Sequence, residues 1–335
     1  MSRGIALVLG ATGYIGGAIA RAALEAGWNV RGLRRRPGAV GATQGLPIDW
    51  REGDLMLPET VAAAFDGAQV VFHAAGYYPQ RSGSIGRHVA VGVLQTRNVV
   101  EAARRAGVKR LIYTSTLTTI GHPPPGESRD ADERDLYVPG SVASSAYYEG
   151  KFAMESEILR ACAAGLPAVI LNPTAVVGPG DVTPTLGGIV LMAARGWGWV
   201  WIETVVNLID VRDVAQAHLA AFQRGQPGQR YILGGDNRPL RQVMEMLADL
   251  AGVSPPRLRV PMPLIDGLAW WSDRLPWLAL FGNHLRAVRH WQSYNTSQAR
   301  QVLGLAPRPL EDTLADMLHG YVERGRLAPR RSVVG

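Results

Sequence analysis

Residues 5–16 read IALVLGATGYIG, and this stretch decides the fold that we expect for the chain. Ile5–Leu9 is a short apolar run typical of a buried strand, and the pattern of Tyr14–Ala26 indicates a helix. Between them Gly10 permits a tight turn, Gly13 lets the backbone approach a pyrophosphate, and Gly16 lets helix and strand pack closely. A purely structural glycine turn is the alternative, but the strand–turn–helix context favours a dinucleotide site. Its predicted contacts are Gly10, Thr12, Gly13, Tyr14, Ile15 and Gly16.

The alternation of strand and helix continues through the first half of the chain. The expected strands are Ile5–Leu9, Asn29–Leu33, Val70–His73, Arg110–Thr114 and Ala168–Leu171. The expected helices are Tyr14–Ala26, Pro58–Phe65, His88–Ala106 and Tyr147–Ala164, three of them followed closely by a glycine. Apolar strands that alternate with helices predict an α/β fold, a doubly wound parallel sheet covered on both faces.

The second half of the chain is less regular. A passage rich in glycine and proline follows Leu171, Arg230–Leu233 is a further candidate strand, and helices rich in leucine and tryptophan follow from about Pro239. We therefore expect a smaller, mostly helical C-terminal substrate lobe. The predicted division assigns residues 1–173 and 206–236 to the dinucleotide-binding domain, 174–205 and 237–325 to the substrate lobe, and 326–335 to a tail.

Composition excludes several classes of protein. With 47% hydrophobic and 19% charged residues the chain is typical of a globular domain, and the single cysteine allows no intrachain disulfide, which favours a cytoplasmic location. No uncharged stretch approaches the roughly 20 residues of a membrane span. The net charge of +7 comes from scattered arginines without interleaved aromatics, so nucleic acid is not an expected partner.

The end of the second expected strand predicts the type of dinucleotide. The sequence continues Leu33-Arg34-Arg35-Arg36, and no acid occurs between Glu25 and Asp49. A carboxylate at this place binds ribose hydroxyls in NAD sites, whereas guanidinium groups grip a 2′-phosphate. NADP(H) is therefore favoured, with Arg35 the best candidate and Arg34 and Arg36 beside it; NAD(H) and a solvated basic loop are the alternatives.

Two further segments are expected at the cofactor because they follow strands of the sheet. Asp54 and Leu55 follow the third strand, where an acid can meet the adenine amino group. His73, Ala74 and Ala75 end the fourth strand, where small residues let the ribose lie close. We interpret His73 as a packed residue of the strand end rather than as a catalyst. We expect no metal site.

Tyr147 and Lys151 are the candidate proton-transfer pair. They are four residues apart on an expected helix, so their side chains share one face. A phenol with a reference pKa near 10 is a poor base, and a nearby ammonium favours the phenolate. Thr116, at the end of the fifth strand, can hold a substrate oxygen, and Tyr147 would then transfer a proton while a nicotinamide transfers hydride.

Tyr-x-x-x-Lys also arises by chance, and two observations weigh against chance here. Lys109 and Lys151 are the only lysines in a chain that otherwise uses arginine. The neighbouring Tyr148 meets Phe152 four residues later, so only Tyr147 has a lysine partner.

The motifs together resemble those of the extended short-chain dehydrogenases/reductases in the NAD-dependent epimerase/dehydratase superfamily, a Rossmann fold. They are GATGYIGG, GDL, FHAA, LIYTST, YYEGK, LNPTAVVGPGD, NLIDVRDVAQAH, RYILGG and the tail LGLAPRPLEDTLADML. The chain is most similar to the dihydroflavonol reductase-like and hopanoid-associated sugar epimerase-like members. This resemblance implies a Thr116–Tyr147–Lys151 triad, a 2′-phosphate contact at Arg35, and a nicotinamide approached by Asn172 and Pro173. It also implies a homodimer that pairs through His88–Ala106 and Tyr147–Ala164.

One motif departs from the family. The third helix usually carries an asparagine in an Asn-Val-x-Gly-Thr pattern, and this chain has Gly92-Val93-Leu94-Gln95-Thr96. We expect the role of that side chain to be absent or met by water.

The leading functional hypothesis is an NADPH-dependent reductase of an aldehyde or ketone. The main alternative is a sugar epimerase that retains NAD, and a non-enzymatic dinucleotide sensor is a third. A dehydratase is disfavoured because Leu117 and Thr118, rather than two acids, follow Thr116.

The lobe's tryptophans favour a small, partly apolar substrate, although we interpret most of them as core. They are Trp197, Trp199, Trp201, Trp270, Trp271, Trp277 and Trp291. Arg195, Arg212 and Arg238 are candidate contacts for an anionic group. Leu264–Leu280 is a minor candidate for membrane contact.

Overall fold

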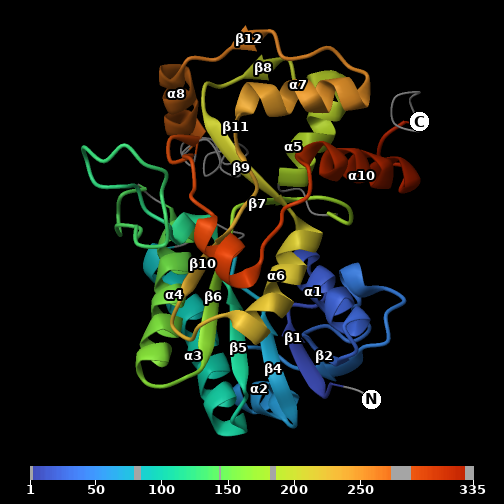
Figure 1. Cartoon of the computed structure of the whole chain (residues 1–335), viewed down its shortest axis with the longest axis vertical. Helices are drawn as coiled ribbons and strands as arrows, with labels where there is room; N and C mark the ends of the chain where they lie inside the picture. The colour runs from blue at the N-terminus through green and yellow to red at the C-terminus, as the bar shows by residue number, and fades with distance from the viewer. Residues whose placement is uncertain (1–2, 79–83, 143–144, 182–185, 273–287, 329–335) are drawn as a thin grey trace.

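The computed structural model describes residues 3–78, 84–142, 145–181, 186–272 and 288–328. Its centre is a seven-stranded parallel sheet in the order β10-β6-β5-β4-β1-β2-β3 (Figure 1). The strands are β1 (Ile5–Leu9), β2 (Asn29–Arg34), β3 (Asp49–Glu52), β4 (Ala68–His73), β5 (Arg110–Thr114), β6 (Ala168–Pro173) and β10 (Arg230–Leu233). The strand order reverses at β1, which lies between β2 and β4, so a crevice opens at the carboxyl ends of these strands. The predicted doubly wound sheet is confirmed.

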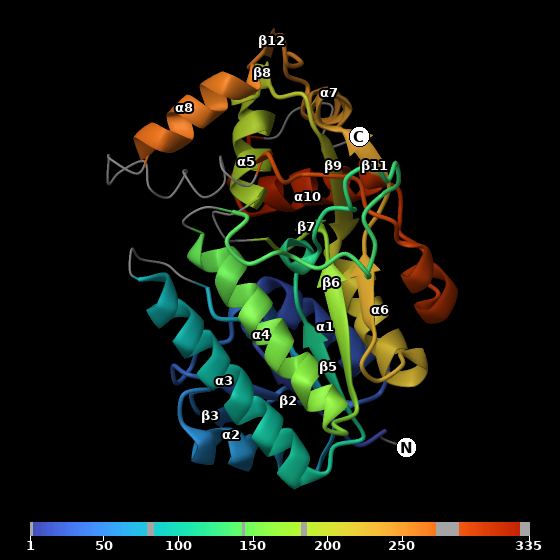
Figure 2. The ribbon, with the colours of Figure 1, turned by 90° about the vertical axis from the view of Figure 1, so that its left-hand side faces the viewer.

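Helices cover both faces of this sheet (Figures 1 and 2). One face carries α1 (Tyr14–Glu25) and α6 (Val211–Arg224), and the other carries α2 (Pro58–Phe65), α3 (Ile85–Ala106) and α4 (Ala146–Ala163). Alternate residues of β1 feed the two cores: Val8 packs on the α1 side, whereas Leu7 and Leu9 pack on the α3 side. Both faces are buried, which explains why β1 is a continuous apolar run.

The structure shifts several of the expected boundaries and gives the bounds of the third strand, which the sequence pattern had not defined. α3 starts at Ile85, three residues before His88, because the Ser84 hydroxyl accepts a hydrogen bond from the Arg87 amide and caps the helix. β3 has the sequence DWRE and lies at the sheet edge. An edge strand needs no continuous apolar run, so the search for apolar runs did not predict β3 from its polar sequence. α3 ends at Gly107, whose φ of 58° is that of a left-handed cap.

The opposite end of the molecule contains more strand than expected. A three-stranded sheet joins β7 (Ala175–Val177), β9 (Val205–Asp210) and β11 (Asn237–Pro239), and a two-stranded sheet joins β8 (Val200–Trp201) and β12 (Leu258–Arg259). Around them lie α5 (Leu186–Met192), α7 (Leu240–Ala251), α8 (Met262–Ser272) and α10 (Leu310–Glu323) (Figure 1). Short helical turns cover Gly41–Thr43, Leu117–Thr119, Ala193–Trp197 and Ala299–Leu303.

These short strands qualify the prediction of a mostly helical lobe. They have only two to six residues each, too few for a clear alternating pattern. β9 pairs with β7 and β11 rather than with the large sheet, so the predicted domain boundary near residue 206 cuts through one small sheet. The division into domains stays a prediction.

The tryptophans of this end are less buried than expected. Trp197 and Trp199 are 72% and 57% exposed, so the core interpretation is wrong for both. The core here is built instead by side chains such as Met317 and Tyr321 on α10. Trp277, part of Leu264–Leu280, the side chains of Trp270 and Trp271, and most of the 326–335 tail lie outside the described residues. Within the described parts of the chain, no helix is both long and apolar enough to cross a membrane.

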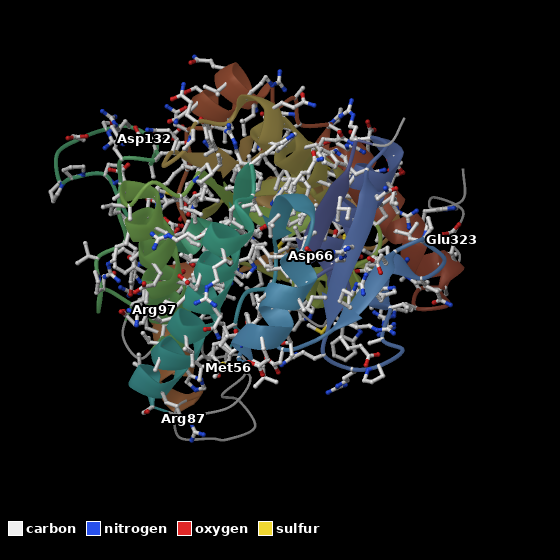
Figure 3. The ribbon with its side chains drawn as sticks, turned by 90° about the horizontal axis from the view of Figure 1, so that it is seen from below. Met56, Asp66, Arg87, Arg97, Asp132 and Glu323 are labelled. Atoms are coloured by element: carbon white, nitrogen blue, oxygen red, sulfur yellow. The ribbon has the colours of Figure 1, made fainter. Side chains whose placement is uncertain are left out.

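An ion pair joins α3 and α4 on the outer surface of this helical layer. Figure 3 shows Arg97 on the outside of α3, and its guanidinium pairs with Glu157 of α4 at 2.9 Å. The two helices are therefore tied together on the solvent side as well as through their buried apolar faces.

Candidate active site

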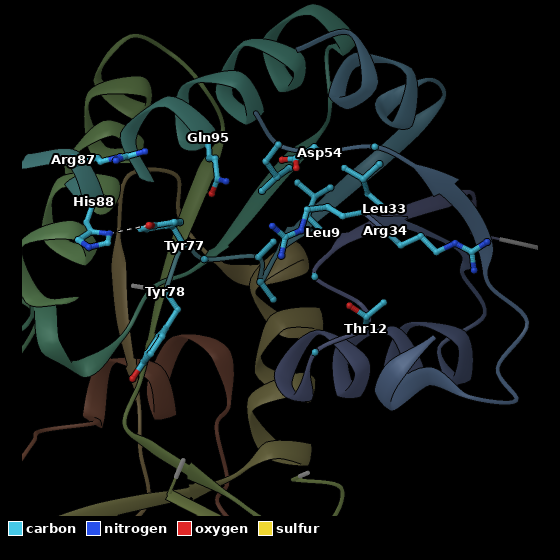
Figure 4. Close-up of a pocket in the computed structure, with 18 residues that line it drawn as sticks. Leu9, Thr12, Leu33, Arg34, Asp54, Tyr77, Tyr78, Arg87, His88 and Gln95 are labelled. Atoms are coloured by element: carbon cyan, nitrogen blue, oxygen red, sulfur yellow. Dashed lines mark hydrogen bonds between the residues drawn. The ribbon is translucent and has the colours of Figure 1, made fainter. Parts of the chain in front are cut away.

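A groove of about 830 Å³ opens at the carboxyl ends of β1, β2 and β4 (Figure 4). Its lining includes many of the predicted cofactor contacts: Gly10, Thr12, Gly13, Arg34, Arg35, Asp54, Leu55, Ala74 and Ala75. A groove at the point where strand order reverses is the usual place for a dinucleotide in such sheets. Residues from four separate strand ends, predicted one by one, thus meet around a single cavity.

Close packing explains the glycines of the first turn. Gly10 has a φ of 89°, and a Cβ there would lie 2.8 Å from the Ala75 amide nitrogen. A Cβ on Gly16 would overlap the Gly10 carbonyl. Only residues without side chains allow α1 to start this close to β1, which leaves its first amides facing the groove.

Tyr14, Ile15 and Gly16 lie behind this turn and are not among the groove-lining residues. The Tyr14 hydroxyl is buried, and burial together with Asp181 and Asp210 raises its pKa. These three residues are placed to support the turn rather than to line the cavity.

The arginines after β2 occupy different positions. Arg35 lies exposed at the groove and Arg36 lies exposed outside its lining. Arg34 extends over the Trp50 ring at 5.4 Å and contacts Glu52 at 3.4 Å. The loop that follows packs back on the glycine turn, because the Ala42 amide donates to the Thr12 carbonyl at 3.2 Å. This contact holds the basic end of β2 beside the turn.

The segment after β3 is held by two hydrogen bonds. Asp54 accepts the Met56 amide at 2.9 Å, and the Leu55 carbonyl accepts the Asn98 side-chain amide at 2.8 Å. Asn98 was not among the predicted site residues. It comes from α3, and no local pattern links it to Leu55.

His73 is a neutral, packed side chain. It is buried at the end of β4, and neither ring nitrogen has a hydrogen-bond partner among the described residues. Burial, with a smaller contribution from the Lys151 charge, lowers its pKa to about 3. Its ring contacts Tyr113 edge to face at 5.4 Å, which agrees with the interpretation as a packed residue.

Tyr147 and Lys151 lie together at the start of α4, and Ser145 caps this helix. Lys151 Nζ is 5.8 Å from the centre of the Tyr147 ring. The amine also lies against Gly76, where any Cβ would overlap it. A glycine after FHAA therefore makes room for this lysine next to the groove.

The electrostatics of the pair differ from the simple expectation. Burial raises the pKa of the Tyr147 phenol, and the nearby Thr116 and Thr118 hydroxyls lower it in part. Burial lowers the pKa of Lys151 to about 8. The phenol is therefore protonated at neutral pH, the form that can donate a proton, and the lysine is still largely charged.

The structure also identifies groove residues that sequence reasoning missed. They are Tyr77, Tyr78, Arg87, His88 and Gln95 (Figure 4). Tyr77 hydrogen-bonds to His88 Nδ1 at 2.8 Å, and the Tyr78 ring lies 5.1 Å from that of Tyr147. The signal available in the sequence for Tyr77 and Tyr78 was their place directly after FHAAG, and for Arg87 and His88 it was their place at the start of the next helix.

Met154 explains the departure at Gly92. A Cβ on Gly92 would lie 2.9 Å from the Met154 sulfur, and Met154 is buried. The thioether therefore takes up the space beside this glycine, whereas we had expected a missing interaction or a water.

Asn172 and Pro173 end β6 and are fully buried, so neither lines the groove. Asn172 Nδ2 lies 3.2 Å from the Thr116 carbonyl oxygen, which connects this strand end to the candidate triad. Among the described residues, no group of three His, Cys, Asp or Glu side chains is placed to hold a metal ion.

Comparison with known proteins agrees with this geometry. A model of the NAD dependent epimerase/dehydratase family matches residues 6–234. A dihydroflavonol 4-reductase-like protein of Synechocystis sp. is 35% identical, with 95% of this chain and 94% of the relative covered. Sterol demethylase protein B of Methylococcus capsulatus is 31% identical, with 96% and 99% covered.

A solved structure gives the same result. The crystal structure of a protein called gox2253 superposes with a TM-score of 0.83 at 34% identity, with 96% of this chain and 99% of that chain covered. The glycine turn, the groove and the Tyr147–Lys151 pair are thus found in a chain whose nearly full length aligns with enzymes of one family. The chain belongs to the NAD-dependent epimerase/dehydratase family, whose members include NAD(P)-dependent reductases and epimerases.

Proposed function

We propose that the protein is an NADP(H)-dependent oxidoreductase that interconverts an aldehyde or ketone and the corresponding alcohol. The observation that carries this proposal is the basic rim of the groove, where Arg34 ends β2 and Arg35 follows it. NADPH is an exchangeable reductant, so a site suited to its 2′-phosphate favours net reduction over internal redox cycling.

The charges at this rim support a phosphate rather than a pair of ribose hydroxyls. The nearby acid Glu52 is already in contact with Arg34, which leaves the exposed Arg35 to face a ligand. A guanidinium binds a phosphate through paired, charge-assisted hydrogen bonds. NAD(H) remains the alternative cofactor, because Asp54 also lines the groove.

The candidate triad supports proton donation to a carbonyl oxygen. When bound, the reduced nicotinamide supplies hydride. Tyr147 holds a proton at its phenol oxygen, and the nearby Thr116 hydroxyl can share the substrate carbonyl with it. Lys151 would donate to the cofactor ribose and keep a positive charge near the phenol.

The surroundings of Tyr147 support a partly apolar substrate. The aromatic ring of Tyr78 lies beside the phenol and forms part of the groove. The relatives named above carry the words dihydroflavonol and sterol in their names. We propose a carbonyl compound with an apolar or aromatic body.

Epimerisation of a sugar conjugate is the second candidate, because the matching family includes epimerases. Such an enzyme oxidises and re-reduces its substrate with one retained NAD. A dinucleotide sensor is disfavoured because Tyr147 and Lys151 are both present.

The nucleotide bound to the purified protein distinguishes these functions. One portion of the protein would be denatured and the released nucleotide identified by chromatography. A second portion, freed of bound nucleotide without denaturation, would be titrated with NADPH and NADH. An empty or exchangeable site with preference for NADPH is the expected result. Stoichiometric, tightly retained NAD would contradict the proposal and favour the epimerase.

The expected assembly and location are part of the same proposal. A homodimer would pair through α3 and α4, the two helices that the family resemblance implies for the interface, and its mass in light scattering would be twice that of the chain. We also propose a cytoplasmic location, in which NADPH is available.

A further inference from the structure

A buried ion pair connects α4 with the far edge of the sheet. Glu155 of α4 and Arg230 of β10 lie 2.8 Å apart, and their side chains are only 3% and 6% exposed. Neither residue lines the groove or belongs to the predicted site. Two buried charges carry a large desolvation cost, which is offset only by good polar partners.

The partners of Glu155 lead toward the candidate triad. One carboxylate oxygen, Oε2, lies 2.7 Å from the Thr119 hydroxyl and accepts the Asn172 amide at 2.8 Å. The other oxygen, Oε1, faces Arg230. The carboxylate therefore ties β6 and the turn after β5 to the helix that carries Tyr147.

Both of these partners also contact the backbone of Thr116. Its carbonyl oxygen lies 3.2 Å from Asn172 Nδ2 and 3.0 Å from the Thr119 hydroxyl. Since a hydroxyl has one proton, Thr119 donates to the closer, charged carboxylate. Asn172 Nδ2 also lies 2.8 Å from the Thr119 hydroxyl oxygen, and the Thr119 backbone amide donates to the Thr116 carbonyl at 3.3 Å, so the carboxylate holds Thr116 through both Thr119 and Asn172. The side chain of Thr116 lies near the Tyr147 phenol and lowers its pKa.

Arg230 holds the outer side of the same turn. Its guanidinium donates to the Thr119 carbonyl at 2.8 Å and to the Glu133 carbonyl at 3.0 Å. Both members of the ion pair thus contact Thr119 and together fix its position. The chain of contacts runs from Arg230 through Glu155 and Asn172 to Thr116, and ends at the phenol.

The spacing on α4 makes this arrangement effective. Tyr147, Lys151 and Glu155 follow one another at intervals of four residues and lie on one face of the helix. A helix anchored at Glu155 cannot rotate without moving the phenol away from Thr116.

We propose that Glu155 and Arg230 are positioning residues that hold the Thr116 hydroxyl against the Tyr147 phenol. This inference rests on the proposed function for the identity of the reaction, but the placement of Thr116 against the phenol can be tested without a substrate. A purely stabilising pair would be replaceable by apolar side chains of similar volume. A positioning pair is not replaceable in this way, because its polar atoms set the place of Thr116.

The test compares Glu155→Gln, Arg230→Lys and the double variant Glu155→Leu/Arg230→Leu with the parent protein. Glu157→Gln is the matched control, since Glu157 is on the same helix but pairs with Arg97 at the surface. We expect kcat for NADPH-dependent reduction to fall by about 10- to 100-fold in the three variants, as for a misplaced catalytic group. NADPH affinity and the control variant should be unchanged.

A second readout needs no substrate. Tyrosine ionisation is followed by absorbance as the pH is raised. The part of this titration that is missing in Tyr147→Phe belongs to the Tyr147 phenol. Since the Thr116 hydroxyl lowers the pKa of this phenol, its displacement should move the titration midpoint upward in Glu155→Gln and in the double variant.

The two readouts separate the outcomes. An inactive parent with a shifted midpoint in the variants would refute the proposed function and support the positioning role. A double variant with parental kcat and midpoint would overturn the positioning role, as would unfolding of all three variants, since the pair would then serve stability alone.

Discussion

The two ends of the molecule differ in how tightly their backbone is constrained. At the cofactor end a single added methyl group on Gly16 would overlap the Gly10 carbonyl, and all seven strands of the large sheet lie in one parallel order. At the opposite end Gly188 of α5 has no atom within 4 Å of an added Cβ, and Ile189, Met192 and Trp197 are exposed. The glycine turn of the cofactor end is thus specified by close packing, whereas the outer face of α5 at Gly188 has room for a side chain. The class of cofactor can therefore be predicted from this sequence, whereas the particular substrate cannot.

The largest expected effect concerns the chemical step. Tyr147→Phe removes the proton donor and should lower kcat by about 10²- to 10⁴-fold while NADPH affinity is retained. Steady-state rates from nicotinamide absorbance and a binding titration measure both. Tyr148→Phe, one residue along the same helix, is the control and should keep most of the activity. A Tyr147→Phe enzyme with parental kcat would remove this residue from the mechanism.

The next prediction tests the difference between the two ends directly. Gly16→Ala should abolish measurable NADPH binding, because the added methyl group forces α1 away from the glycine turn. Gly188→Ala is the matched change in α5, and it should leave binding and the thermal midpoint unchanged. If calorimetry gave the same NADPH affinity and the same thermal midpoint for Gly16→Ala and Gly188→Ala, the proposed difference between the two ends would be refuted.

A smaller effect is expected at the rim of the groove. Arg35→Ala should weaken NADPH binding by about 10- to 100-fold, the equivalent of one or two hydrogen bonds to a charged group. NADH binding should not change, since NADH lacks the 2′-phosphate. Arg36→Ala, outside the groove lining, is the control. If Arg35→Ala weakens both nucleotides equally, the 2′-phosphate assignment is wrong.

The smallest effect is a pH dependence of stability at the cofactor end. The pKa of His73 is about 3 in the folded protein, against about 6.5 for an unperturbed histidine. Between these values the unfolded chain binds more protons, so the free energy of unfolding falls as the pH drops below 6.5, by at most about 1.4 kcal/mol per pH unit. His73→Phe should reduce this slope in urea unfolding at a series of pH values. An unchanged slope would show that His73 is charged or exposed in the folded state.

Much of the cofactor end could be predicted because its signals are local. The glycine spacing, the FHAA strand end and the Tyr147–Lys151 interval each lie within a few residues of sequence. The Glu155–Arg230 pair has no such signal, because 75 positions separate two residues that meet only after β6 and β10 pair. Asn98 at Leu55 and Met154 at Gly92 are hidden for the same reason.

The substrate end was harder to predict because its strands are short and its core joins helices that are far apart in the sequence, such as α7 and α10. β8 and β12 have two residues each, which is too few for any periodicity. Tryptophan was taken as a sign of burial, yet Trp197 and Trp199 are exposed. Large aromatic side chains reach the surface where no neighbouring element covers them.

Nucleotide consumption during turnover tests the central claim most directly. The purified protein would be mixed with NADPH and a panel of aldehydes and ketones with apolar or aromatic bodies, and both nicotinamide and product would be quantified. We predict many turnovers, with one NADPH oxidised for each carbonyl reduced, and much slower turnover with NADH. Conversion of a sugar conjugate with no net change in nicotinamide, by protein that carries bound NAD, would contradict the account.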